Sequence, residues 1–435
     1  MKIYLVSLGC ARNLVDSELI LGSFKDQGWV IAKDPEKAHV IVINTCSFIK
    51  DAIDESLDTI LELSKYKKEG ICRCLIVVGC LPERFREQIT SSLPEVDAFL
   101  GTGAFDKIIE VASNLSNHTC FLPNPNSSII QGKNEKRVIS SKEQAYIKIA
   151  EGCNRGCTYC VIPKLRGKHR SRPLEFILSE AKQLIDQGVK ELTLVSQDTT
   201  LYGKEFGIDL SYLLTEMSKL SDDIWIRLLY LHPEGITDKL INTISSYPNI
   251  CPYFDIPIQH SDKNVLKKMG RKYDEDFLYK LFDKIRNKVK DAVIRTTVLI
   301  GFPDEKKKNF DLLLNFIKNV RFDHLGAFIY SDAEDIPSYN IPGKVSKITA
   351  KRRLDVIMSE QASISLEINK KYIGKKLRVL VEEKQNKNLF TCRTIFQAPE
   401  VDGVTYVKGS LSEKKGFIYV KIKESDIYDL MGVFD

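Results

Sequence analysis

The stretch that decides the fold is residues 151–161, EGCNRGCTYCV, where three cysteines form a CxxxCxxC array (Cys153, Cys157 and Cys160). The array directly follows residues 146–150, an apolar run with the length and composition of a β-strand. Thiolates are soft ligands that favour iron–sulfur clusters and zinc, and three of them can bind three irons of one [4Fe–4S] cluster. Because no fourth cysteine is near, one iron keeps an open coordination position, which suits catalysis.

The alternative for this array is a zinc site or a set of buried thiols. Zinc sites usually complete such an array with a second CxxC or an adjacent histidine, and His169 is the only imidazole close in sequence. The spacing and the position after a strand favour the cluster with an open iron.

The first segment of the chain has the pattern of a parallel α/β sheet. Apolar, β-rich runs at residues 3–7, 40–44 and 75–78 alternate with stretches of helical periodicity at residues 13–27 and 51–65. Strands that are apolar throughout, alternating with helices, are typical of a parallel sheet covered on both faces.

Three further cysteines take equivalent positions in this segment, since Cys10, Cys46 and Cys80 each follow one of the predicted strands. The carboxyl ends of parallel strands meet at one edge of an open α/β sheet, so the three thiols can converge despite their distance in sequence. The alternative is three independent buried cysteines, which are common in protein cores. The repeated placement favours a second cluster, again with an open iron.

A second strand–helix series predicts a partial or full β/α barrel, with its chemistry at the carboxyl ends of the strands. Its six predicted strands are residues 146–150, 191–196, 225–230, 253–257, 294–300 and 326–330. A long charged helix is expected over residues 351–371. Short alternating runs then predict a small antiparallel β-barrel, at residues 376–382, 390–396, 404–407 and 417–422.

We therefore predict an α/β protein with a parallel α/β sheet domain, a partial TIM-like (β/α)6 barrel and a small antiparallel β-barrel. The predicted boundaries are 1–122, a linker at 123–144 rich in Pro, Asn, Ser and charge, 145–365 and 366–435.

Composition limits the class of protein but not its partner. The chain has 435 residues, 43% hydrophobic and 28% charged, which excludes collagen-like and fully disordered chains. A net charge of +6 does not by itself indicate a nucleic-acid partner. The 11 cysteines suggest thiolate or metal chemistry in a reducing compartment, and no run reaches the roughly 18 apolar residues of a membrane span. We expect a cytoplasmic protein.

The remaining five cysteines are expected to be structural: Cys72, Cys74, Cys120, Cys251 and Cys392.

Residues 163–173, PKLRGKHRSRP, form a basic stretch beside the CxxxCxxC array. A solvated basic loop and a contact with an anionic group both fit this pattern.

The array after a first barrel strand resembles the radical S-adenosylmethionine (SAM) superfamily. The second trio in an N-terminal α/β domain, with a C-terminal barrel similar to a TRAM domain, resembles the methylthiotransferase family within it. Further segments resemble the branch that modifies ribosomal protein S-twelve, rather than the tRNA-modifying MiaB branch: SLGCARNLVDSE (7–18), NTCSFIKDAIDES (44–56), SQDTTLYG (196–203), DIPIQH (255–260) and APEVDG (398–403).

The resemblance implies two [4Fe–4S] clusters, one on each cysteine trio, with S-adenosylmethionine at the open iron of the CxxxCxxC cluster. It implies cofactor contacts from Tyr159, which matches an aromatic position near the adenine, and from the acidic position Glu305. Tyr159 could equally serve ordinary packing. No acid–base catalytic residue is assigned, because the radical step belongs to the cofactor.

Two stretches depart from the family pattern. The usual GFPGET is GFPDEK at residues 301–306, with Asp304 in place of a glycine, which leaves the details of cofactor contact there open. The usual EEGT-like stretch is AEDI at residues 333–336, so its substrate contacts cannot be carried over.

The resemblance implies transfer of a methylthio group to the β-carbon of an aspartate in ribosomal protein S-twelve, free or in the small subunit. Reductive cleavage of S-adenosylmethionine supplies the radical, so an electron donor such as flavodoxin or ferredoxin is implied. The alternative is methylthiolation of a tRNA anticodon-loop adenosine, as in the MiaB branch. The C-terminal barrel is only slightly basic, which favours a protein substrate over RNA.

Overall fold

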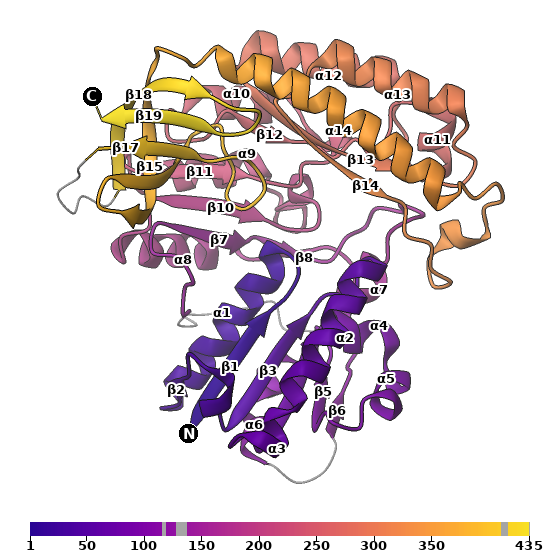
Figure 1. The fold of residues 1–435 in the computed structure, drawn as a ribbon, viewed down its shortest axis with the longest axis vertical. Helices are drawn as coiled ribbons and strands as arrows, with labels where there is room; N and C mark the ends of the chain where they lie inside the picture. Colours follow the sequence, from indigo (N-terminus) through magenta and orange to yellow (C-terminus); the bar gives the residue numbers. More distant parts are fainter. Residues whose placement is uncertain (115–118, 128–136, 410–415, 435) are drawn as a thin grey trace.

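The computed structural model describes residues 1–114, 119–127, 137–409 and 416–434. It has three packed parts: an N-terminal domain, a central domain and a C-terminal barrel (Figure 1). The architecture predicted for each part is confirmed.

The N-terminal domain is a parallel sheet between two layers of helices. Its strand order is β2-β1-β3-β4-β5-β6, with β1 (Lys2–Ser7), β2 (Val30–Ile31), β3 (Val40–Thr45), β4 (Cys74–Gly79), β5 (Ala98–Leu100) and β6 (Thr119–Phe121). Helices α1 (Ala11–Asp26) and α6 (Ile108–Ser113) pack on one face. Helices α2 (Lys50–Ser64), α4 (Cys80–Phe85) and α5 (Glu87–Ser92) pack on the other, and α3 (Tyr66–Glu69) follows α2. Strands β3 and β4 are buried throughout because both of their faces are covered.

The central domain is an open barrel of six parallel strands. Their order is β7 (Gln144–Lys148), β10 (Glu191–Val195), β11 (Trp225–Leu228), β12 (Tyr253–Asp255), β13 (Val293–Ile300) and β14 (His324–Ile329). A parallel bridge between Ile226 and Ile250 links the first three strands to the last three. The partial (β/α)6 barrel predicted from sequence is thereby confirmed.

Helices cover the outer face of this open barrel and form the largest apolar core with it. They are α8 (Leu174–Asp186), α9 (Leu210–Ser218), α10 (Asp238–Ser246), α12 (Glu275–Lys288), α13 (Lys307–Val320) and α14 (Lys347–Lys370). Smaller elements lie at the carboxyl ends of the strands: β8 (Ala150–Glu151), β9 (Arg170–Ser171), α7 (Ile162–Arg166) and α11 (Lys263–Lys268).

The C-terminal part is a closed five-stranded barrel in the order β15-β16-β17-β19-β18. Its strands are β15 (Lys376–Asn386), β16 (Leu389–Thr394), β17 (Thr405–Lys408), β18 (Gly416–Ser425) and β19 (Leu430–Phe434). The pairing is antiparallel except between β17 and β19, which run parallel and close the barrel. Strand β19 was not among the predicted strands.

The inner face of the central sheet is covered by the other two parts of the molecule. Side chains of β11 and β12, including Trp225 and Tyr253, pack in one apolar cluster with the core of the C-terminal barrel and with Val15 of α1. With the inner face covered in this way, the carboxyl ends of the central strands face the N-terminal domain.

The predicted linker is described in part, and residues 128–136 lie outside the described residues. The buried Arg137 forms ion pairs with Glu18 of α1 and Glu180 of α8, so this end of the linker is tied to both domains. Within the described residues, no helix is both long and apolar enough to cross a bilayer.

Candidate functional site

The structure brings the three N-terminal cysteines together at one edge of the first sheet. Cys10 precedes α1, Cys46 follows β3 and Cys80 opens α4, so each lies at the carboxyl end of one of three adjacent strands. This edge faces the central domain (Figure 1).

A glycine permits the close approach of the first two cysteines. Gly9 has a φ of 89°, which side-chain-bearing residues rarely adopt. A Cβ at this position would lie 2.7 Å from the Cβ of Cys46 and 3.0 Å from its Sγ. The sequence LGC at residues 8–10 therefore places one loop directly against the next thiol.

Arginines contact two of these three thiols. The Nε of Arg12 donates to Cys10 Sγ at 3.4 Å, and the Nη2 of Arg166 donates to Cys80 Sγ at 3.6 Å. Burial raises the pKa of the Cys10 thiol, but the charge and hydrogen bond of Arg12 outweigh it, so the pKa falls below its ordinary value. The charge of Arg12 thus favours the thiolate form of Cys10, the form that binds metal, whereas burial raises the pKa of Cys80 despite the charge of Arg166.

Cys46 lies between the other two thiols and has a different environment. Burial, followed by the charge of Cys80, raises the pKa of Cys46 to about 11. Its backbone N–H donates to Ser56 Oγ at 3.2 Å, and the same hydroxyl donates to the Cys46 carbonyl at 2.8 Å. A metal that binds here must displace the thiol proton.

The CxxxCxxC loop is held between two neighbouring segments of the central domain. The N–H of Cys153 donates to Gly167 O at 3.0 Å, while the N–H of Thr158 donates to Met269 O at 3.1 Å, at the end of α11. Burial raises the pKa of Cys160 to about 12, and the charges of the other two cysteines add to this effect. The three thiols of the loop are therefore close enough to interact.

The chemistry of both trios fits a cubane cluster. Among the residues that the structure describes, no three Cys, His, Asp or Glu side chains are grouped tightly enough to hold a single metal ion. One zinc ion would hold its thiolates about 2.3 Å from one point, whereas a cubane spreads three thiolates over three irons. Three neighbouring thiolates are the donor set that a cubane with one open iron requires, so the chemistry of each trio fits such a cluster.

Tyr159 lies within the CxxxCxxC loop, between Cys157 and Cys160, and packs with Val265, Met269 and Phe302. Its hydroxyl accepts a hydrogen bond of 2.6 Å from the Nη2 of Arg271. The other two nitrogens of this guanidinium, Nε and Nη1, are buried without a hydrogen-bond partner among the described residues. Buried, unpaired donors are costly, and they are expected where a ligand completes a site.

Glu305 is buried, and both of its carboxylate oxygens have protein partners. Oε2 accepts from the Gly301 N–H at 2.8 Å, and Oε1 accepts from Arg353 at 2.6 Å. Asp304 has a φ of 62°, which glycine adopts more easily, and its carboxylate pairs with Lys268 and Lys306. In this structure Glu305 holds the loop after β13, and its contact with a cofactor stays a prediction.

A buried group of charges joins the N-terminal domain to the central domain. Asp16 of α1 pairs with Lys148 of β7 and with Arg166, at 2.8 Å for the second pair. Glu151 pairs with the same two cations, at 2.8 Å and 3.4 Å. Burial opposes ionisation of Glu151, but Lys148 and Arg166 lower its pKa to about 2. This group lies between Cys80 and the CxxxCxxC loop.

The residues of the basic stretch 163–173 differ in role. Arg166 and Arg172 are buried, and Arg172 pairs with Glu180 at 2.7 Å. Lys164 is exposed and pairs with Asp335 at 3.1 Å.

The AEDI stretch also lies at the domain interface. Asp335 pairs with Arg84 of α4 at 2.6 Å, and Ile336 packs against Cys80.

The five other cysteines lie apart from both trios. Four are buried in apolar cores, as expected of structural thiols: Cys72, Cys74, Cys251 and Cys392. Cys120 is exposed on the edge strand β6.

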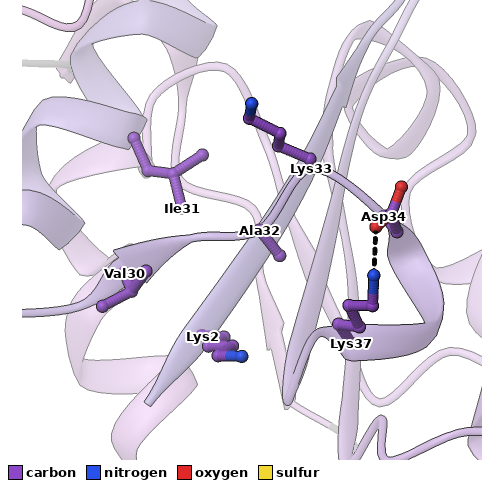
Figure 2. Close-up of a pocket in the computed structure, with 7 residues that line it drawn as sticks. All are labelled: Lys2, Val30, Ile31, Ala32, Lys33, Asp34 and Lys37. Carbon is purple, nitrogen blue, oxygen red and sulfur yellow. Dashed lines mark hydrogen bonds and ion pairs between the residues drawn. The ribbon is translucent and has the colours of Figure 1, made fainter.

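A small pocket lies at the opposite end of the first sheet, beside β2. Figure 2 shows its lining, including Lys2 at the start of β1 and the ion pair between Lys37 and Asp34. Its volume of about 240 Å³ is below the roughly 300–1,000 Å³ of most small-molecule sites. It belongs to the amino ends of the strands and not to the candidate site.

Some residues of the site were not predicted from sequence. In the sequence, Arg12 and Arg271 stand in ordinary polar stretches that do not mark them as site residues. Of the two, Arg12 alone could have been suspected, because it follows Cys10 by two residues. Lys148 had a clearer signal, since it is a charged residue inside the apolar run YIKIA. A buried charge in a strand requires a partner, and here the partners come from another domain.

Three family models match successive parts of the chain. Residues 2–101 match the uncharacterized protein family UPF0004, residues 147–317 match the radical SAM superfamily, and residues 373–434 match the TRAM domain. Among solved structures, the radical S-adenosylmethionine methyltransferase TsrM from Kitasatospora setae is similar in fold, with a TM-score of 0.59 and 12% identity over 78% of this chain and 77% of that one.

Curated relatives match the chain over nearly its whole length. A protein of Desulfosudis oleivorans is 48% identical and one of Clostridioides difficile is 44% identical. Both alignments cover 99% of this chain, with 99% and 98% of the relatives. Both relatives are named ribosomal protein uS12 methylthiotransferase RimO. The chain has the radical SAM and TRAM domains and is 48% identical to a RimO protein over 99% of its residues. It therefore belongs to the RimO family of methylthiotransferases.

Proposed function

We propose that the protein transfers a methylthio group from its cofactors to the β-carbon of an aspartate in ribosomal protein uS12. Two [4Fe–4S] clusters serve this reaction, one on each cysteine trio, and S-adenosylmethionine binds at the CxxxCxxC cluster. The names of the full-length relatives support the substrate, and the radical SAM family supports the cofactors.

The observation that carries the proposal is that both cysteine trios lie at the interface of the same two domains, where a residue of one domain contacts a cysteine of the other. Arg166 follows Cys160 closely in the chain, and its guanidinium contacts the Sγ of Cys80 in the other domain. A reaction that needs a radical from one cluster and sulfur from the other requires this proximity, because the substrate carbon must reach both.

The surroundings of the CxxxCxxC loop fit an anionic cofactor group. The unpartnered Nε and Nη1 of Arg271 are donors for a carboxylate, and the ring of Tyr159 offers an apolar face beside them. When bound, S-adenosylmethionine and this cluster supply a carbon radical by one-electron cleavage. Tyr159 then orients the cofactor, and the Glu305–Arg353 pair keeps the loop after β13 in place.

Residues at the ends of the central strands close the space between the trios. Arg12 reaches from the N-terminal domain to Ser196 O at 3.1 Å and lies 4.7 Å above the ring of Tyr230. Tyr230 has a φ of 63°, a strained conformation of the kind found at functional sites. In the proposed reaction these contacts shield the reactive intermediates from solvent and from side reactions.

The proposed partners follow from the same reaction. The substrate is uS12, free or in the small ribosomal subunit, and the C-terminal barrel docks it. A small electron carrier such as flavodoxin or ferredoxin supplies the electron, and the reaction takes place in the cytoplasm.

The test is intact-mass spectrometry of uS12 after anaerobic incubation with the reconstituted protein, S-adenosylmethionine and a reductant. We expect a mass gain equal to one methylthio group replacing one hydrogen, and fragmentation should place it on an aspartate. Total tRNA incubated in parallel should stay unmodified. Modification of a tRNA adenosine with unchanged uS12 would contradict the proposal.

A further inference from the structure

The geometry points to Arg166 as a positioning residue that holds the Cys80 thiolate through a directed N–H···S bond and raises the reduction potential of the N-terminal cluster. This inference rests on the proposed function, because it requires a cluster on the N-terminal trio. It adds a role for the domain interface, which then sets a property of that cluster.

The contact itself joins two domains. Arg166 is the last residue of α7, which begins two residues after Cys160. Its Nη2 lies 3.6 Å from the Sγ of Cys80, which opens α4 in the N-terminal domain. The domain that carries one trio therefore donates a hydrogen bond to a sulfur of the other.

Other contacts fix the guanidinium in this position. Nη2 also donates to Asn13 Oδ1 at 2.5 Å, and Nη1 donates to Asp16 Oδ2 at 2.8 Å. The Arg166 side chain is 3% exposed, so it has no freedom to leave Cys80 without breaking buried ion pairs.

Arg166 stabilises the Cys80 sulfur both by its charge and by the oriented N–H of Nη2, while burial and the Asp16 carboxylate act against it. Two carboxylates, Asp16 and Glu151, face two cations, Lys148 and Arg166. A lysine in place of Arg166 keeps this balance of charges, so the substitution isolates the contribution of the oriented N–H. Apolar neighbours, Leu165 and Ile336, keep this bond away from water and strengthen it.

The expected consequence is electronic. Hydrogen bonds to cluster sulfurs stabilise the reduced, more negative state and so raise the reduction potential. Arg12 acts on Cys10 in the same way, but it comes from the N-terminal domain itself. Of these two contacts, it is the one from Arg166 that makes the potential depend on the docking of the two domains.

The test is a redox titration of the N-terminal cluster, monitored by electron paramagnetic resonance. It uses the full chain with the other trio replaced by alanine (Cys153→Ala, Cys157→Ala, Cys160→Ala), so that one cluster gives the signal. Arg166→Lys keeps the charge but cannot span Asp16 and Cys80 together. We expect the reduction potential of the N-terminal cluster to be lower in Arg166→Lys by at least about 59 mV, which corresponds to a tenfold change in the one-electron equilibrium constant.

The matched control is Arg137→Lys, since the buried side chain of Arg137 also joins the two domains by ion pairs but has no contact with a cysteine among the described residues. It should leave the potential unchanged. In the chain with both trios intact, Arg166→Lys should also lower the ratio of methylthiolated product to 5′-deoxyadenosine, and Arg137→Lys should not.

Two outcomes contradict the inference in distinguishable ways. A cluster that assembles in Arg166→Lys with the potential of the control variant overturns the inference and leaves the proposed function intact. Failure of the unsubstituted N-terminal trio to bind any cluster overturns both.

Discussion

At the scale of single residues, the N-terminal trio depends on backbone geometry as much as on thiol chemistry. Gly9 has a positive φ and lies against Cys46, so any side chain there meets two constraints at once. Gly28, just after α1, has a φ of 76°, but a Cβ added there would have no heavy atom of the described residues within 4 Å, apart from its chain neighbours. A substitution at Gly28 therefore tests backbone strain alone, whereas one at Gly9 tests backbone strain together with steric overlap.

We predict that Gly9→Ala destabilises the protein by about 3 kcal/mol and lowers the iron bound by the N-terminal trio. The positive φ alone costs about 1–2 kcal/mol, and the overlap with Cys46 adds a packing penalty. Gly28→Ala should cost only the first amount and keep full iron content. Urea denaturation and iron analysis measure both. Equal effects of the two substitutions would contradict this account of Gly9.

At the scale of elements, the long apolar strands could be predicted from sequence, whereas several short strands could not. Strands β3 and β4 are buried on both faces and read as continuous apolar runs. Strand β2 has two residues and β5 has three, too few for a periodic signal, and their pairing depends on neighbouring strands. Strand β19 includes Gly432 and completes the barrel by pairing with β18, which directly precedes it in the chain, and in parallel with β17.

The candidate site, too, could be predicted from sequence only in part. The positions of six cysteines after predicted strands were enough to bring them into two groups. The arginines that contact them could not be predicted, because their roles arise from the docking of one domain on another. The apolar strands β10, β11 and β16 likewise contain charges whose partners come from across an interface.

One such set of charges joins the central sheet to the C-terminal barrel. Glu191 of β10 pairs with Arg227 of β11 at 2.6 Å and with Arg393 of β16 at 2.8 Å. Burial of Glu191 favours the neutral acid, but the charges of the two arginines prevail, and its pKa lies below the ordinary value. The carboxylate therefore contributes to stability only while it is ionised.

We predict that the free energy of unfolding decreases in acid partly through Glu191. A carboxyl group with a depressed folded-state pKa gives its full stabilisation above the unfolded-state pKa, about 4.3. That stabilisation is lost as pH falls through the folded-state value. Glu191→Gln should cost about 3–5 kcal/mol at neutral pH, because two buried arginines lose their partner. Its unfolding free energy should depend less on pH below 5 than that of the unsubstituted protein.

Urea denaturation between pH 3 and pH 7 measures this difference. The control is Glu216→Gln on α9, whose carboxylate pairs at the surface with Lys219. It should cost less than about 1 kcal/mol. Identical pH dependence in Glu191→Gln and the unsubstituted protein would contradict the assignment.

At the scale of the whole molecule, the C-terminal barrel completes the core of the central domain. The open sheet exposes an inner face, and the barrel covers it with contacts such as that between Phe417 and Trp225, whose ring centroids are 4.6 Å apart. Figure 1 shows the barrel against one end of the central sheet and the N-terminal domain beneath it. The barrel is thus both a structural cover and the proposed docking module.

We predict that a chain ending after α14 is aggregation-prone, because the truncation exposes Trp225, Leu229 and Tyr253 together. The soluble fraction after expression and the binding of a hydrophobic dye measure this. Tyr419→Ser, which alters an exposed barrel residue, serves as the control and should remain soluble. A truncated chain that stays monomeric and binds no more dye than the full chain would contradict the prediction.

The central claim is that the two trios have separate tasks in one reaction, and one comparison tests it most directly. It measures 5′-deoxyadenosine and methylthiolated uS12 formed by two full-length variants, one with Cys10, Cys46 and Cys80 replaced by alanine and one with Cys153, Cys157 and Cys160 replaced. We predict that the first variant still releases 5′-deoxyadenosine but forms no methylthiolated product, and that the second forms neither. Methylthiolated product from either variant would contradict the claim.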